Sequence, residues 1–160
     1  MKMIKITLLL LYSLSAILFW GIHQMTPDPG TTSGNGNPGL LLAGLLIPLF
    51  IISVVVWVRI FRSRTISNRA YKFSIVAIIL HLISAHLYRL SELIGYRRYI
   101  EGVLFTKDGT VDIDYVMAIT SGLSIHINHL NFSVNTFFMF ISFTILIACI
   151  NVLVQRWEKE

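Results

Sequence analysis

The sequence predicts an all-α integral membrane protein with four membrane-spanning helices. Of its 160 residues, 55% are hydrophobic and only 13% are charged, about half of the charged fraction usual in a soluble domain. The apolar residues are gathered into four runs, each long enough to cross a bilayer as a helix. A short arginine-rich segment separates two of these runs, which is typical of a loop between spans. We therefore expect a single polytopic membrane domain over residues 1–160.

The first two spans are expected at about residues 6–23 and 40–59. The first is read as an uncleaved helix, because its apolar run is long and reaches Trp20 without a small-residue cleavage pattern. Residues 24–39 between them contain three prolines and four glycines, so a linker without regular structure is expected there. This linker lacks the spacing of the phosphate-binding glycine motifs.

The loop at residues 59–72 predicts the orientation of the chain. It holds five basic residues and no acidic residue, and short loops rich in Lys and Arg stay on the cytoplasmic side. With four spans, both termini are then cytoplasmic. Nine of the Lys and Arg residues fall inside: Lys2, Lys5, Arg59, Arg62, Arg64, Arg69, Lys72, Arg156 and Lys159. Four fall outside or near the outer end: Arg89, Arg97, Arg98 and Lys107.

The third and fourth spans are expected at about residues 72–94 and 131–154, with an external segment at 96–128 between them. In that segment, Asp108-Gly109 lies between two stretches that alternate in polarity, a pattern that predicts a short β-hairpin. An alternative with five spans would make residues 112–130 cross the membrane. It is disfavoured because that stretch contains two histidines and an asparagine.

Polar side chains interrupt the third span, and they are the features around which the bundle is expected to be organised. At about 100° per residue most of them share one broad face of the helix, which should look into the bundle because lipid offers no hydrogen-bond partner. Arg89 and Glu92, three residues apart, are placed to pair. The expected polar seam comprises His81, Ser84, Tyr88, Arg89, Glu92, Asn131 and Asn135.

A metal site is a more specific interpretation of the same region than a structural polar seam. Its candidate ligands are His86, Glu92, His126 and His129, since histidine and carboxylate ligands from facing helices hold metals in helix bundles. No HExxH-type spacing supports it, so a structural seam is favoured and no cofactor is expected. No catalytic residue is assigned, because no nucleophile motif is present. The single cysteine, Cys149, excludes a disulfide within the chain and a zinc-type cysteine cluster.

The expected function is therefore non-enzymatic. We interpret the chain as a multi-pass cell-membrane protein of bacterial type, acting as an accessory, regulatory or immunity-type subunit through helix packing and its external segment. Its expected partners are the lipid bilayer and another membrane protein or further copies of itself. Nucleic acid is not expected, because the basic residues flank apolar runs. The alternatives are a metal- or haem-binding membrane protein, including an oxidoreductase, and a small oligomeric transporter or channel.

Overall fold

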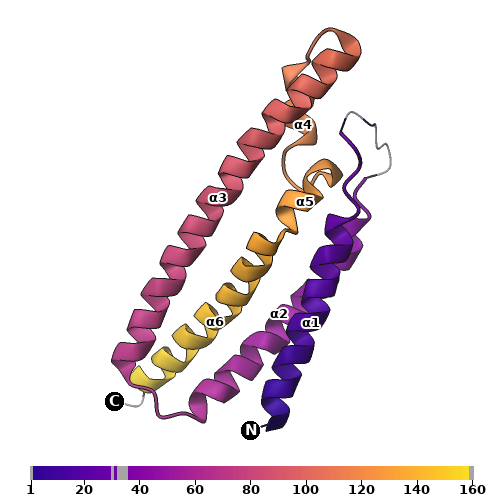
Figure 1. The fold of residues 1–160 in the computed structure, drawn as a ribbon. Coiled ribbons are helices and arrows are strands. Elements are labelled where there is room, and N and C mark those ends of the chain that lie inside the picture. Colours follow the sequence, from indigo (N-terminus) through magenta and orange to yellow (C-terminus); the bar gives the residue numbers. More distant parts are fainter. Residues whose placement is uncertain (1, 30, 32–35, 159–160) are drawn as a thin grey trace.

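Four long helices run side by side in a bundle, and a string of short helices joins the third to the fourth (Figure 1). The computed structural model describes residues 2–29, 31 and 36–158. The long helices are α1 (Lys2–His23), α2 (Gly39–Arg62), α3 (Asn68–Asp108) and α6 (Val134–Trp157). The short ones are α4 (Ile113–Ile119), the 3-10 helix η1 (Ile125–Ile127) and α5 (Asn128–Asn131). We call the end where α1 begins and α6 ends the terminal end, and the opposite one the far end.

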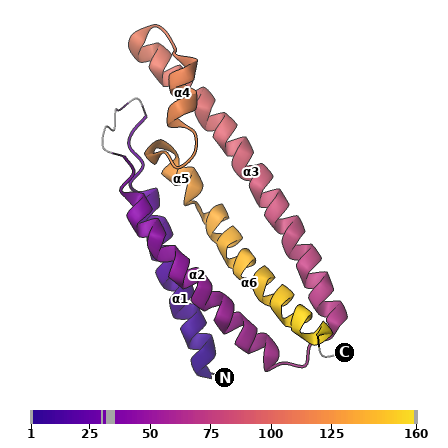
Figure 2. The same cartoon turned by 180° about the vertical axis from the view of Figure 1, so that it is seen from behind.

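The four predicted spans are confirmed as helices. Each of the four long helices is long and apolar enough to cross a membrane. Residues 112–130, which would cross the membrane in the five-span alternative, are described throughout and contain no helix of that length. They form α4, η1 and α5 instead. The largest difference from the prediction is the length of α3. Its 41 residues correspond to about 62 Å at 1.5 Å per residue, and its last turns extend beyond every other helix (Figure 2).

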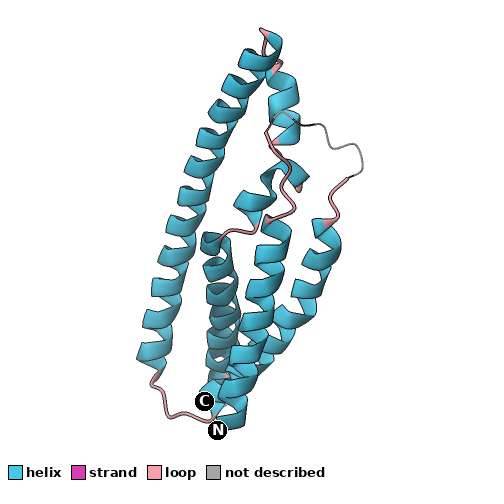
Figure 3. Ribbon diagram, turned by 45° about the vertical axis from the view of Figure 1, so that its right-hand side comes forward, coloured by secondary structure: helices cyan, strands magenta, loops and turns pink. Residues whose placement is uncertain are grey.

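The predicted β-hairpin is wrong. Residues 96–108 continue α3, and the described part of the chain contains no strand (Figure 3). Gly109 ends the helix with a φ of 70°, and its N–H donates to the carbonyl of Phe105 at 2.9 Å. An Asp-Gly pair that fits a hairpin turn thus serves as a left-handed helix cap. Beyond it, the Asp112 side chain caps α4 by accepting from the Tyr115 N–H at 3.1 Å.

This turn brings α4 back against the end of α3. Ile100 and Leu104, one turn apart on α3, meet Val116 of α4, and all three are buried. Their spacing of four residues is that of a helix face. The two helices and the turn between them therefore form a helical hairpin at the far end, with a small apolar core of its own.

The helix α6 is the centre of the bundle, since it contacts both α2 and α3. Toward α1 and α2, the main core comprises Phe19, Ile22, Leu46 and Leu49. Rings from the α6 side surround Phe19 edge-on at centroid distances of 5.5–5.7 Å, a geometry that aromatic pairs prefer. The start of α6 is set by a capping box in which Ser133 and Thr136 bond each other's backbone N–H groups.

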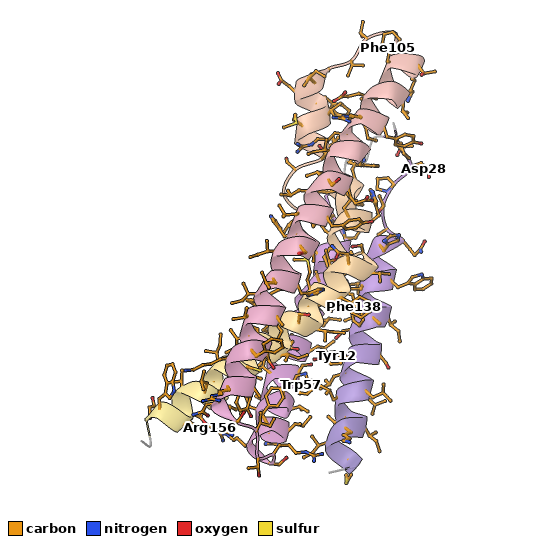
Figure 4. The ribbon with its side chains drawn as sticks, turned by 60° about the vertical axis from the view of Figure 1, so that its left-hand side comes forward. Tyr12, Asp28, Trp57, Phe105, Phe138 and Arg156 are labelled. Carbon is orange, nitrogen blue, oxygen red and sulfur yellow. The ribbon has the colours of Figure 1, made fainter. Side chains whose placement is uncertain are left out.

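A hydrogen-bonded triad joins α1, α2 and α6. The indole N–H of Trp57 on α2 donates to the Tyr12 hydroxyl on α1 at 2.7 Å, and that hydroxyl lies 2.7 Å from the Thr144 hydroxyl on α6 (Figure 4). Polar groups buried among apolar helices cost free energy unless they are paired in this way.

At the terminal end, α3 is anchored to α6. Tyr71 is buried against Cys149, Val152 and Leu153. Arg156 closes the contact: its Nη1 donates to the Ile66 carbonyl at 2.6 Å, and its guanidinium lies 4.9 Å from the centre of the Tyr71 ring. The segment between α2 and α3 is thereby tied down.

At the far end, a clasp of small and amide residues holds α1, α2 and α5 together. Asn37 and Asn128 exchange two hydrogen bonds, at 2.7 and 3.0 Å, and Asn128 is fully buried. Thr26 accepts from the His129 N–H at 2.9 Å. Both Thr26 and Asn37 belong to the predicted linker at 24–39, of which residues 30 and 32–35 lie outside the described residues.

Gly39 allows this clasp to close, and its replacement is the test. A Cβ at Gly39 would lie 2.8 Å from Ile22 Cγ2 and 3.1 Å from Asn128 Nδ2. We expect Gly39→Ala to lower the free energy of unfolding of the detergent-solubilised protein by about 1–3 kcal/mol, measured by thermal or denaturant unfolding. Gly44→Ala on the same helix is the matched control, because no atom lies within 4 Å of its Cβ position. Equal stability of the two variants would contradict the clasp.

Candidate functional site

The helix α3 is the least covered of the long helices. Only 6% of its most apolar stretch is buried, against 28% in α2 and 33% in α6. At about 100° per residue, its surface divides into three faces. One face packs against α6, and the other two are exposed. The composition of the two exposed faces differs sharply, which makes α3 the candidate functional element.

The packed face joins α6 and α5 through a series of polar contacts. His81 Nδ1 lies 3.1 Å from the Ser142 hydroxyl, and one turn further the Asn135 amide donates to the Ala85 carbonyl at 2.9 Å. One more turn on, Arg89 donates to Asn131. These three contacts follow the i, i+4 row of α3, the row that stays in register with a neighbouring helix.

The seven residues expected in the polar seam are divided between this face and the exposed surface. Four of them, His81, Arg89, Asn131 and Asn135, make the contacts between α3 and the α5–α6 segment. The other three, Ser84, Tyr88 and Glu92, are exposed. Arg89 donates to Asn131, and within the described part of the chain no ion pair joins it to Glu92.

One exposed face of α3 is aliphatic. It carries Ile79, Ile83, Leu87, Leu90 and Ile94, which are 38–60% exposed. The other exposed face, called the hydroxyl face below, carries small and hydroxyl-bearing residues and ends in a cation. It comprises Ala77, Ser84, Tyr88, Ser91, Gly95 and Arg98, all of them exposed.

The hydroxyl face is open to close approach. No atom lies within 4 Å of a Cβ built on Gly95. Within the described residues, the hydroxyl groups of Ser84, Tyr88 and Ser91 form no hydrogen bond. This face therefore offers donors, acceptors and room for a backbone to approach, all at once.

On the other side of the packed face, a groove of about 610 Å³ opens between α3 and the α2–α6 pair. Leu82, His86 and Arg89 line it from α3, and Phe50 and Phe140 line it from α2 and α6. His86, which shares no face with the other polar residues of α3 in the sequence, thus lies at this groove.

Three of the five histidines gather at the far end of the bundle. The His129 ring lies edge-on to Tyr96 with centroids 4.4 Å apart, and 6.3 Å from the His23 ring. Burial lowers the pKa of His129, as does His23, while Glu92 nearby raises it. His126 is 5% exposed, and burial lowers its pKa as well. The Nδ1 atom of His129 is buried and has no hydrogen-bond partner among the described residues.

The four candidate metal ligands do not assemble into one group. His86 lines the groove, Glu92 and His129 lie near each other, and His126 is buried in η1. Among the described residues, no three His, Cys, Asp or Glu side chains come close enough together to hold a metal ion. The far-end histidines instead make ring contacts and backbone hydrogen bonds.

Several residues that organise the structure were not singled out in the sequence. Tyr12, Trp57 and Thr144 form the core triad, and Asn37 with Asn128 forms the clasp. Each is a single polar residue inside an apolar run or a loop, so it does not belong to a periodic pattern of polar residues that would identify it in the sequence. The only available signal is that a polar group among membrane helices needs a partner on another helix.

No protein-family profile, no curated protein and no solved structure matches this sequence. The function is accordingly argued from the residues of the chain itself.

The buried histidines predict a pH-dependent far end. In the folded chain the pKa of His126 and that of His129 lie below the ordinary histidine value of 6.5. At a pH between the folded-state pKa and 6.5, the unfolded chain therefore binds more protons than the folded chain. The contribution of these two neutral histidines to stability is complete above about pH 6.5 and is lost as the pH falls below it. We expect the unfolding midpoint of the solubilised protein to drop between about pH 7 and pH 5. The double variant His126→Gln, His129→Gln should show a shallower dependence, and an equally steep one would contradict this assignment.

Proposed function

We propose that this chain is an accessory or regulatory membrane subunit, of which an immunity-type protein is one form, that binds a helix of another membrane protein through α3. The observation that carries the proposal is the hydroxyl face, in which Ser84, Tyr88, Ser91 and Gly95 follow one another turn by turn and are exposed, beside a face of aliphatic residues.

The four long helices support a location in the membrane. Each is long and apolar enough to span a bilayer. From Asn68 to Arg89, α3 rises about 32 Å, close to the 30 Å thickness of the hydrocarbon core. Arg89 then lies at the boundary of the hydrocarbon on the far side, level with Asn131, its hydrogen-bond partner. The remaining turns of α3 project about 29 Å beyond it.

The basic loop supports the orientation proposed for this membrane protein. Arg59 and Arg62 lie in the last turn of α2, and Arg64 follows between α2 and α3, all at the terminal end. By the positive-inside rule, the terminal end is cytoplasmic, and the helical hairpin of α3 and α4 faces outward.

In lipid, the two exposed faces of α3 have different requirements. Ile79, Ile83 and Leu87 of the aliphatic face lie below Arg89 and are well solvated by acyl chains. Ser84 and Tyr88 also lie below Arg89, and their hydroxyl groups have no hydrogen-bond partner in lipid. Small residues on this face leave a shallow surface that a second helix can approach closely. A protein helix satisfies both conditions, so we assign the hydroxyl face to a protein partner and the aliphatic face to lipid.

The chemistry of the hydroxyl face favours a different chain over a second copy. Two copies inserted with the same orientation would pair α3 in parallel about a two-fold axis, so each residue would meet its own counterpart. Arg98 would then face Arg98, which is unfavourable, and the bulky Tyr88 side chains would meet at one height. A partner helix with small or hydroxyl-bearing residues in the membrane and a carboxylate opposite Arg98 fits better.

The projecting hairpin supplies further contact area outside the membrane. Tyr99 and Phe105 on α3 and Ile113 on α4 are 57%, 61% and 54% exposed, with Phe105 at the tip (Figure 4). Apolar side chains presented to water in this way are typical of interaction surfaces. The proposed partner therefore contacts α3 along the membrane and the hairpin beyond it.

Photo-crosslinking in the native membrane tests the partner. A p-benzoylphenylalanine residue in place of Ser91 should form an adduct with a spanning segment of a different membrane protein that carries Asp or Glu near its outer end. The same residue in place of Leu90, the adjacent position and about 100° away on the aliphatic face, should form none. Arg98→Glu should lower the yield roughly tenfold by like-charge repulsion, and Arg98→Lys should preserve it.

Charge exchange provides the second half of this test. Replacing the identified partner carboxylate by a basic residue should restore the adduct to Arg98→Glu. An adduct with twice the mass of this chain, or equal yields from positions 91 and 90, would contradict the proposal.

Cysteine labelling tests the orientation. In a Cys149→Ala background, Arg98→Cys should react with a membrane-impermeant maleimide added to intact cells. Arg64→Cys should react only after the membrane is opened, because the basic loop is cytoplasmic in the proposed orientation. Labelling of Arg64→Cys in intact cells would reverse the orientation and leave the helix arrangement untouched.

A further inference from the structure

The groove between α3 and the α2–α6 pair has the size and lining of a ligand site. Its volume of about 610 Å³ lies within the usual range for small-molecule sites. Its walls are aromatic and aliphatic: Phe50, Phe140 and Phe143 form one side, and Leu82 forms the other. The centroid of the Phe50 ring lies 5.5 Å from that of Phe140 and 5.8 Å from that of Phe143, so this wall is a continuous apolar surface.

The polar end of the groove is cationic. His86 and Arg89 line it, and among the residues that the structure describes no acidic one does. Arg89 donates to Asn131, but a guanidinium has five N–H donors in a planar fork, so several remain for a ligand. Arginine in such a position matches the oxygen atoms of a phosphate.

The depth of the groove matches that of a lipid in the outer leaflet. Arg89 lies about 32 Å along α3 from Asn68, at the boundary between hydrocarbon and headgroups. Phe143 lies twelve residues beyond Asn131 in the chain, and because α6 runs toward the terminal end (Figure 1), it is deeper in the membrane. The groove thus runs from headgroup level, where the cation is, down into the acyl region, where the aromatic wall is.

We propose that this groove binds one phospholipid with an anionic headgroup. Its acyl chain lies along Phe50, Phe140 and Phe143, and its phosphate accepts hydrogen bonds from Arg89, with His86 beside it. The inference rests on the membrane location proposed above, and it is independent of the partner of the hydroxyl face.

A second cavity in the chain supplies an internal comparison. It has about 360 Å³ and lies between α1 and α6, where Trp20, His23 and Phe137 are among its lining residues. No Lys or Arg lines it. We assign it to lipid without headgroup preference, so the selectivity of the whole protein should depend on Arg89.

The test is the headgroup preference of co-purifying lipid. The full-length protein is reconstituted in bilayer nanodiscs with equal amounts of phosphatidylglycerol and phosphatidylcholine, released into mild detergent, and examined by native mass spectrometry. We expect one tightly held lipid, with phosphatidylglycerol about tenfold preferred, because phosphatidylcholine carries a choline cation beside the same phosphate and the described lining offers it Arg89 and no carboxylate. Arg89→Gln should bring the ratio close to one, and Arg89→Lys should keep most of the preference.

Two further variants separate binding from structure. Arg98→Gln removes a cation from α3 outside the groove and should keep the preference. Leu82→Trp fills the groove and should remove the tightly held lipid whatever its headgroup. An unchanged thermal unfolding midpoint shows that each variant is folded.

Four results would overturn the proposal. They are equal retention of the two lipids by the unaltered protein, a loss of preference in Arg98→Gln as large as in Arg89→Gln, no effect of Leu82→Trp, and displacement of the lipid by inorganic phosphate alone, which would assign the site to a free anion. A protein that remains in solution without detergent would instead refute the membrane location. This readout distinguishes a failure of the proposed membrane location from a failure of the proposed lipid site.

Discussion

The contact between α3 and α6 is the interaction on which the rest of the structure depends. At the terminal end it is apolar, with Tyr71 buried against the last turns of α6. Higher up it becomes polar, through the contacts of His81, Ala85 and Arg89 with residues of α6 and α5. Since polar groups among membrane helices must find partners within protein, these contacts fix the register of α3. They also leave the rest of its circumference exposed.

Both proposed sites follow from this one-sided attachment. Because α3 is held along a single row, one side of that row opens as the groove containing Arg89, and the other side carries the hydroxyl face. A helix packed on two neighbours would have buried one of them. The core of α1, α2 and α6 needs no contribution from α3, since the Phe19 rings and the Tyr12–Trp57–Thr144 triad hold these three helices together. The bundle thus combines a firmly packed half with a half whose surface is available.

The far end links the two halves. The Asn37–Asn128 clasp joins the packed half to the segment that returns from α3, and His129 lies between His23 of α1 and Tyr96 of α3. Changes at the projecting hairpin therefore have a contiguous route to the core through α5. The histidine and glutamate residues that suggested a metal site serve in this arrangement as ring contacts and as charges near one another. Burial lowers the pKa of both His126 and His129.

The sequence alone determined the four long helices, because a run of about twenty apolar residues has one stable form in a membrane. It also marked α3 as the unusual helix, since the polar residues of that span are costly unless they have a use. It failed where one local pattern fits two structures. Asp108-Gly109 suits a hairpin turn and a helix cap equally, and only the burial of Ile100 and Leu104 against α4 selects the helix. Likewise, helical period placed Ser84 and Arg89 on one broad face. The position of α6 then decided that Arg89 donates to Asn131 while Ser84 stays exposed. Pairing depends on which side chains of other helices lie within hydrogen-bond distance, and the sequence of a single helix does not specify how its neighbours are placed.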